Sequence, residues 1–223
     1  MKKVYMLMAD YYHTDDVLRP GMETALGQGY EYLNDPDLFP WNSLCEDASG
    51  VVIAKSDDFS TDLDHPRYNE LFAPIADWMT EERSAALERY IKSGGGALFI
   101  HSGLLWREDS PMARLVGGYF IDHPQLQPII NVPFADHPVT RGVQNFTAAD
   151  ELYECRIYSD TVTPLCASYT SKPSGKPTVL SGWCREHGAG RIVALTPGHT
   201  LESITNPNMT RMIQNSIEWI QSR

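Results

Sequence analysis

The sequence of 223 residues predicts an α/β fold in which a mostly parallel, doubly wound sheet carries helices on both faces. The first observation is two short apolar runs, Val51–Ala54 and Ala97–Ile100, whose unbroken hydrophobicity is typical of strands buried on both faces. The second is the alternation of such runs with helix-forming stretches, which is the pattern of βαβ units. The length suits a single domain over residues 1–223, and the sequence contains no linker or internal repeat that would divide it.

Local signals place the elements of the first half of the chain. Lys3–Met8 is apolar enough to be the first strand. A helix is expected to begin at Pro20, since proline favours the first helical position, and to continue through residues 22–32. Another helix is expected after Thr80, because a hydroxyl caps a first turn and the helix dipole favours the two glutamates that follow. The glycines at 94–96 end this helix before the next strand.

The second half begins with a short helix that is expected over Pro111–Val116. Strand-like segments then follow one another with short turns between them, which favours an antiparallel or mixed part of the sheet. These segments are Thr161–Tyr169, Thr178–Trp183 and Arg191–Thr196, and a separate strand is expected earlier, over Ile129–Val132. The last helix is expected to be capped by Asn206, with Pro207 at its first position.

Charge and composition exclude several classes of protein. The formal net charge of −11 disfavours nucleic acid and anionic membranes as partners, because both are negatively charged. No run approaches the ~20 apolar residues of a membrane span. The apolar run after Lys2 and Lys3 is ended by Asp10 too early for a signal peptide. The four cysteines form no C-x-x-C pair, so we expect reduced thiols in a cytoplasmic protein.

Two histidines follow predicted strands in similar turns, Ile100-His101-Ser102-Gly103 and Pro197-Gly198-His199-Thr200. Ligands bind at the carboxyl edge of open α/β sheets, so His101 and His199 are expected to share a site there. Neutral imidazoles near carboxylates either bind a divalent ion such as zinc or act as general acid and base, and both alternatives stay open. Neither H-x-x-x-H nor H-E-x-x-H occurs, so the spacing adds no stronger metal signal.

Other polar residues are considered for the same site. One carboxylate of the pair Asp150 and Glu151 is expected to face it as a base or ligand, unless the pair is simply solvated. His123 is a further candidate, whereas His137 is expected to begin a turn. Ser102 lacks the G-x-S-x-G turn of a nucleophile, and neither a phosphate loop nor a dinucleotide-binding glycine motif occurs. A surface position is expected for His13, His65 and His187.

Residues 58–78 form a long connection that is rich in aromatic residues and prolines. A connection of this length in a compact domain usually has a function or packs against another subunit. We therefore expect the protein to be a homo-oligomer.

Six motifs along nearly the whole chain carry a resemblance to a known family. They are Leu18-Arg19-Pro20-Gly21-Met22, Gly94 to Gly103, Leu115 to Phe120 with His123-Pro124, Asp136 to Gly142, Asp150-Glu151-Leu152-Tyr153, and Gly190-Arg191 with Pro197 to Thr200. Their order is similar to that of the ThuA-like (trehalose utilisation) family, a branch of the class I glutamine amidotransferase-like superfamily. The resemblance implies a flavodoxin-like fold.

The resemblance also implies where the chemistry lies. In glutamine amidotransferases the turn similar to Ile100–Gly103 carries a nucleophilic cysteine, whereas this chain has His101, which cannot form a thioester. Amidotransferase activity is therefore not expected. The family implies a small carbohydrate as partner, trehalose or a related disaccharide or keto-sugar. The expected catalytic residues are His101, His199 and Glu151; the two histidines are the ligands of any divalent metal, and the expected substrate contacts are Ser102, Trp106, His123 and Tyr153.

Two positions depart from the family pattern. Met22 stands where some members have a histidine, and Leu104 stands where polar residues can occur. A metal site with many histidines is therefore not expected. The alternative to an enzyme is a non-catalytic sugar-binding or regulatory protein that keeps the pocket.

Overall fold

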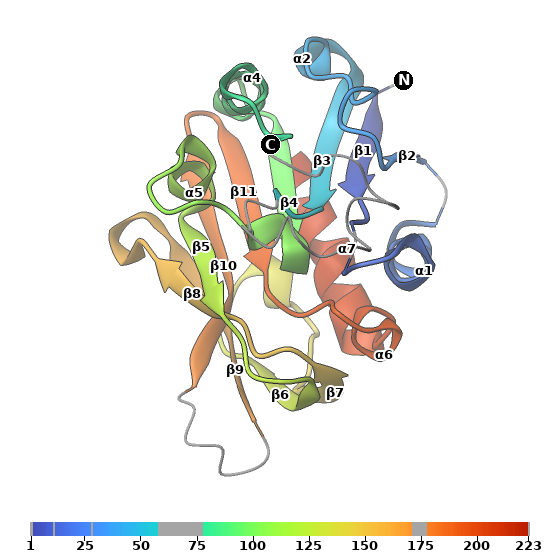
Figure 1. Ribbon diagram of the computed structural model, residues 1–223, viewed down its shortest axis with the longest axis vertical. Coiled ribbons are helices and arrows are strands. Elements are labelled where there is room, and N and C mark those ends of the chain that lie inside the picture. Colours follow the sequence, from blue (N-terminus) through green and yellow to red (C-terminus); the bar gives the residue numbers. More distant parts are fainter. Residues whose placement is uncertain (1, 11, 28, 58–77, 171–177, 223) are drawn as a thin grey trace, which may run out of the picture.

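The computed structural model describes residues 2–10, 12–27, 29–57, 78–170 and 178–222. Within these residues a sheet of nine strands runs through the molecule, and a sheet of two strands lies beside it (Figure 1). The order in the large sheet is β2 (Tyr30–Leu33), β1 (Lys3–Met8), β3 (Ala48–Ala54), β4 (Gly96–Ile100), β11 (Gly190–Leu195), β10 (Val179–His187), β9 (Thr163–Thr170), β6 (Gln127–Pro133) and β7 (Phe146–Asp150). The small sheet pairs β5 (Gly118–Asp122) with β8 (Glu154–Ile157).

The large sheet has a parallel and an antiparallel part. Strands β2, β1, β3, β4 and β11 run parallel to one another, as the βαβ pattern predicts. From β11 onward each pair is antiparallel, through β10, β9, β6 and β7. The mixed sheet expected from the consecutive strand-like segments is therefore confirmed.

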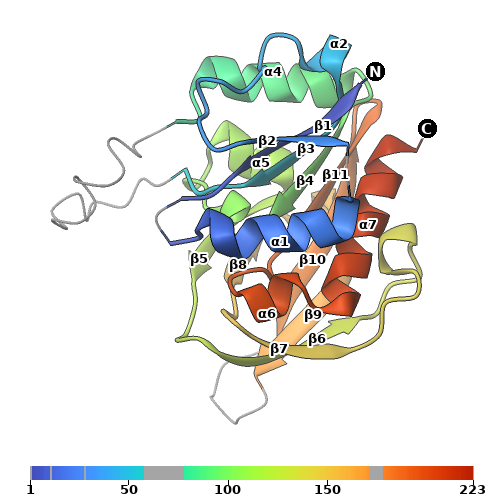
Figure 2. The same cartoon turned by 90° about the vertical axis from the view of Figure 1, so that its right-hand side faces the viewer.

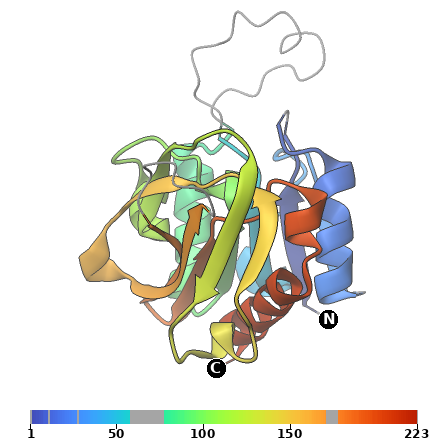
Figure 3. The ribbon, with the colours of Figure 1, turned by 90° about the horizontal axis from the view of Figure 1, so that it is seen from below.

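Helices cover both faces of this sheet, which confirms the doubly wound α/β fold. One face carries α1 (Asp15–Leu26), α6 (Leu201–Ile204) and α7 (Pro207–Gln221), which lie together on the same side in Figures 2 and 3. The other face carries α2 (Leu44–Asp47), α4 (Glu81–Lys92) and α5 (Pro111–Val116) (Figure 1). Three short 3₁₀ turns complete the described elements: η1 (His101–Leu104), η2 (Pro138–Thr140) and η3 (Ser159–Thr161).

Strand β4 lies at the centre of the core and leads into the candidate site. Its side chains alternate between two hydrophobic clusters: Phe99 packs with the α4 face and Leu98 with the α7 face. All five residues of β4 are buried, and burying each large side chain stabilises the fold by roughly 1.5–3 kcal/mol. The residue that follows β4 is therefore held on a rigid support.

Several element boundaries agree with the sequence signals. Strand β1 spans the predicted Lys3–Met8, and α5 spans the predicted Pro111–Val116. The hydroxyl of Thr80 accepts a hydrogen bond of 3.3 Å from the backbone N–H of Arg83 and so caps α4. Asn206 caps α7 in the same way, with Pro207 at the first helical position.

The first helix begins earlier than the sequence predicts. Helix α1 begins at Asp15, five residues before the predicted start, and Pro20 lies inside it. Thr14 precedes two aspartates in the first turn, a start signal of the same kind as the one recognised after Thr80. The helix ends at Gly27, where φ is 62°, so the following residues leave it and form β2.

Gly103 is required where η1 passes β3. A Cβ added there would lie 2.1 Å from the carbonyl oxygen of Ile53, which is backbone and cannot move aside. We expect Gly103→Ala to destabilise the fold by roughly 1–3 kcal/mol or more. Chemical denaturation measures this as a lower midpoint. Gly50→Ala is the matched control, since its Cβ would meet Ile220 at an ordinary 3.6 Å; equal midpoints for both variants would contradict the prediction.

The long connection on which the expectation of a homo-oligomer rests spans residues 58–78, and all of it except Trp78 lies outside the described residues. Among the helices that the structure does describe, none combines the length and the apolar character needed to cross a membrane.

Candidate functional site

His101 follows β4 directly and is held in a defined orientation. Its φ of 47° is left-handed, which turns the chain sharply into η1 at the carboxyl edge of the sheet. Its Nδ1 lies 2.7 Å from the carbonyl oxygen of Thr196. A carbonyl only accepts, so Nδ1 carries the hydrogen and Nε2 presents a lone pair to the site. The ring is fully buried, and burial lowers the pKa of His101, which favours this neutral form.

His199 is placed by the carboxylate of Asp150, which is 1% exposed. Asp150 ends β7 and accepts hydrogen bonds from the backbone N–H groups of Glu151 (2.8 Å), Gly198 (2.9 Å) and His199 (3.1 Å). The hydroxyl of Ser203 donates to the same carboxylate. Asp150 therefore fixes the turn after β11 relative to the end of β7.

Glu151 is the carboxylate of the pair that faces the site. Its Oε2 lies 3.1 Å from Nδ1 of His199 and 3.5 Å from Nε2 of His101. Burial acts to raise the pKa of Glu151, but its contacts with the imidazoles of His101 and His199 outweigh burial and hold the pKa well below its ordinary value. Glu151 in turn raises the pKa of His199. The open choice between Asp150 and Glu151 is thereby resolved: Asp150 supports the turn and Glu151 enters the cluster.

His13 is the site residue that the sequence analysis missed. The prediction of a surface position is wrong, because His13 is only 3% exposed. Its Nδ1 lies 2.7 Å from Oδ1 of Asp10, just beyond β1, and its ring centroid is 4.7 Å from that of His101 and 5.1 Å from that of His199. The sequence signal that could have located His13 is its position just after the first predicted strand. Ligands bind at the carboxyl ends of such strands, and the same argument placed His101.

The other two histidines expected at the surface are of a different kind. His187 is partly buried and its Nε2 lies 3.0 Å from Oε1 of Glu88 on α4. His65 lies outside the described residues.

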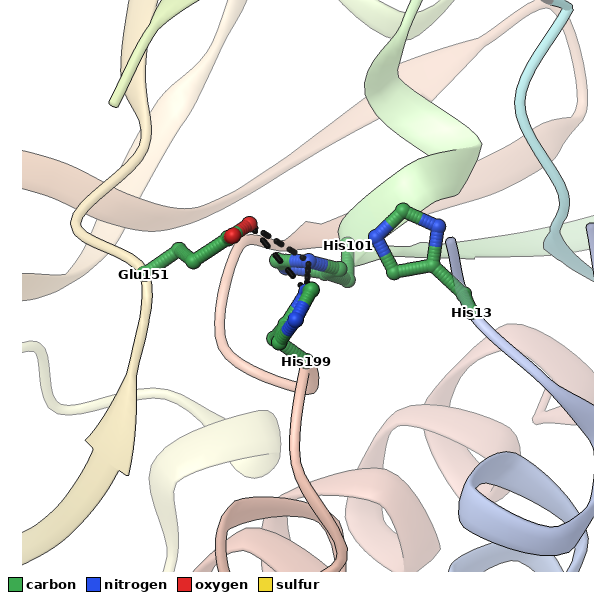
Figure 4. A group of neighbouring side chains, drawn as sticks. All are labelled: His13, His101, Glu151 and His199. Carbon is green, nitrogen blue, oxygen red and sulfur yellow. Dashed lines mark hydrogen bonds and ion pairs between the residues drawn. The ribbon is translucent and has the colours of Figure 1, made fainter. Parts of the chain in front are cut away.

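Figure 4 shows His13, His101, Glu151 and His199 converging from four separate segments. Each offers one ligand atom, and these four atoms lie within 4.8 Å of one another. The histidine nitrogens of 101 and 199 are 3.2 Å apart, and their separations from Glu151 are 3.5 and 3.1 Å. Ligands held at 2.0–2.1 Å from a tetrahedral zinc ion would be about 3.3 Å apart.

The donor set fits a divalent metal. Three imidazoles and one carboxylate are usual zinc ligands. Within the described residues, Nε2 of His13 is a buried polar atom that has no hydrogen-bond partner, and such atoms are costly unless something binds them. The cluster contains three histidines, which is more than the two that the sequence suggested.

Tyr153 and His123 flank the cluster. The ring of Tyr153 stacks on His101 at a centroid distance of 4.1 Å and on His123 at 5.6 Å, and Tyr153 is only 2% exposed. His123 keeps about a third of its side chain exposed, and its Nδ1 lies 3.6 Å from Oε1 of Glu151. Tyr153 therefore supports the two rings, and His123 is the predicted substrate contact that reaches solvent.

Two further predicted substrate contacts lie within the core. Trp106 is 1% exposed and packs against Trp78 and Phe99, at centroid distances of 6.0 and 6.3 Å. Ser102 is fully buried, and among the described residues its hydroxyl has no hydrogen-bond partner. The structure brings neither side chain to an open surface.

His137 has the structural role expected for it. Its Nδ1 accepts a hydrogen bond of 3.2 Å from the backbone N–H of Val139 and so caps η2. Its ring packs against Trp219 of α7 at a centroid distance of 4.9 Å. The four cysteines, all of which lie in described parts of the chain, are free thiols, as expected.

Comparisons with known proteins point to one family. Residues 54–220 match the family model described as ThuA, trehalose utilisation. A putative ThuA-like protein from Bacteroides uniformis has a TM-score of 0.71 at 17% identity, over 98% of this chain and 91% of that chain. The corresponding protein from Parabacteroides merdae has a TM-score of 0.75 at 14% identity, over 99% and 90%. A cytoplasmic protein from Salmonella typhimurium has a TM-score of 0.59 at 15% identity, over 99% of both chains. No curated protein matches the sequence.

At these identities the solved structures show only a shared fold. The assignment to the family rests on the match between the sequence and the family model. The match begins at the end of β3 and runs through α7, so it includes His101, Glu151 and His199. The chain therefore belongs to the ThuA (trehalose utilisation) family.

Proposed function

We propose that the protein is a sugar-processing enzyme that uses a divalent metal, such as zinc, held by His13, His101, His199 and Glu151. The observation that carries this proposal is the convergence of these four ligand atoms within 4.8 Å at the carboxyl edge of the sheet. The family supports a carbohydrate substrate, for which we take a trehalose-like disaccharide or keto-sugar.

A metal in this site would polarise a sugar carbonyl or hydroxyl and stabilise the oxyanion formed when a proton is removed. The residues of the chain supply orientation and proton handling. Thr196 fixes the tautomer of His101, so that its Nε2 faces inward without a proton. Glu151 favours a proton on Nδ1 of His199 whenever that nitrogen has no other ligand. His123, at the solvent side, is the residue we propose to contact the sugar.

Amidotransferase chemistry is not part of this proposal. By its sequence resemblance, the turn of His101 corresponds to the one that carries the cysteine in glutamine amidotransferases, and an imidazole cannot form the thioester that glutamine hydrolysis needs.

Metal analysis and turnover test the proposal together. We expect about one divalent ion per chain in the purified protein, loss of that ion and of turnover with a strong chelator, and recovery of both on adding zinc. The substrate panel contains trehalose and disaccharides oxidised to carry one keto group. A metal-free protein that turns over such a sugar at full rate would exclude the metal. Saturable sugar binding without turnover would indicate the non-catalytic sugar-binding protein instead.

We further propose a cytoplasmic location and self-association. Free thiols support the first, and two structural neighbours from Salmonella typhimurium are described as cytoplasmic proteins. Light scattering of the purified protein at two concentrations tests the second.

A further inference from the structure

Asp10 is surrounded by hydrogen-bond donors on both carboxylate oxygens. Its Oδ1 accepts the backbone N–H groups of Tyr12 and His13, both at 3.0 Å, and lies 2.7 Å from Nδ1 of the His13 ring. Its Oδ2 accepts the backbone N–H of Ser56 at 2.9 Å. Asp10 is 5% exposed, so water does not replace these partners.

These contacts decide which ring nitrogen of His13 is available. A carboxylate only accepts, so Nδ1 of His13 carries the hydrogen that it donates to Asp10. The lone pair is then on Nε2, the buried atom that has no partner among the described residues. The His13 ring packs edge-to-face against His101 and His199, at centroid distances of 4.7 and 5.1 Å. This packing places Nε2 of His13 in the cluster.

We infer that Asp10 is a positioning residue for the metal site. Asp10 acts through the ring of His13 and does not touch the ion itself. This inference rests on the proposed function, and it assigns Asp10 a role that no family resemblance suggested. A carboxylate behind a metal-binding histidine fixes the ring and increases the electron density on its free nitrogen. Asp10 also ties the His13 turn to Ser56 beyond β3, so the ring is anchored to two neighbouring strands.

Asparagine is the informative substitution because it keeps the shape and removes the charge. Four N–H groups point at Asp10, and an asparagine amide has one oxygen and one NH₂ group. Whichever way the amide is turned, at least one donor loses its acceptor. With the oxygen toward His13 the ring keeps its acceptor, the N–H of Ser56 loses its own, and the loss of charge weakens Nε2 of His13 as a ligand.

The test measures zinc affinity by competition with a chelator for wild type, Asp10→Asn, His13→Ala and the double variant. We expect Asp10→Asn to lower the affinity about 10–100-fold, the usual effect of removing such a partner. In the His13→Ala background the same change should have no further effect. The absorption bands of the Co²⁺-loaded proteins should change between wild type and Asp10→Asn, since these bands report ligand geometry.

The outcomes separate the two proposals. Wild type that binds zinc at full stoichiometry, with equal affinity in Asp10→Asn, overturns the role of Asp10 and leaves the metal site standing. If Asp10→Asn lowers the zinc affinity as much in the His13→Ala background as in wild type, the role of Asp10 is also overturned, because Asp10 would then act through the fold and not through His13. Wild type that binds no zinc overturns the proposed function and this inference with it. Circular dichroism of the metal-free proteins checks folding, and Asp10→Ser, which retains an acceptor for the turn, replaces an Asp10→Asn variant that fails to fold.

Discussion

His101→Ala is expected to abolish metal binding and to reduce turnover of an oxidised disaccharide by at least about 100-fold. His101 is central to the cluster: its Nε2 is 3.2 Å from Nδ1 of His199 and 3.5 Å from Oε2 of Glu151. Its removal takes away one of the four proposed ligands and leaves Glu151 in contact with His199. Metal content by mass spectrometry and turnover with the zinc-supplemented variant measure the two effects separately.

Two variants make this experiment specific. His101→Asn removes the imidazole while keeping a residue that tolerates the left-handed φ of 47°, so it separates loss of the ligand from distortion of the turn. His187→Ala removes a histidine that pairs with Glu88 outside the cluster and should keep full metal content. Wild-type turnover by His101→Ala would refute the role assigned to this histidine.

Removal of the metal is expected to lower the melting temperature by about 5–10 °C. The ion would join residues 13, 101, 151 and 199, which belong to segments that unfolding separates. Binding to the folded state alone stabilises it by about 2.7 kcal/mol when the free metal is 100 times its dissociation constant. For a domain of this size, each kcal/mol moves the melting temperature by roughly 2–4 °C.

Thermal unfolding followed by circular dichroism, with zinc and with chelator, measures this shift. In His13→Ala and His101→Ala the difference between the two conditions should largely disappear, because a ligand is missing. An unchanged shift in both variants would show that zinc stabilises the protein at another place. Gly50→Ala, which alters no ligand, should retain the wild-type shift.

One geometric rule accounts for most of what the sequence predicted. Apolar runs located the strands, and parallel strands place their carboxyl ends along one edge. His101 after β4 and His199 after β11 meet there because these two strands are direct neighbours in the sheet. Glu151 follows β7 at the far end of the sheet, and its approach depends on the hydrogen bonds between Asp150 and the turn of His199, which no local pattern reveals.

The residues missed or displaced show the limits of local patterns. The loop-like neighbours of His13 predict a surface position, yet hydrogen bonds to Asp10, three residues away in the sequence, fold this loop inward. Trp106 was expected to contact a sugar, but its indole fills space between Trp78 and Phe99. The identity of a side chain does not say which layer of the molecule it enters, because packing against distant segments decides this.

The position of β11 has a consequence for the order of events during synthesis. This strand lies between β4 and β10, but it is translated after every other strand of the sheet. Until residues 190–195 have left the ribosome, the edge of β4 lacks its partner and the two parts of the sheet cannot join. An unpaired apolar edge of this kind is prone to aggregate, so the nascent chain should depend on chaperones late in translation. His199 follows β11 in the chain, so the proposed set of metal ligands is also complete only after β11 has been synthesised.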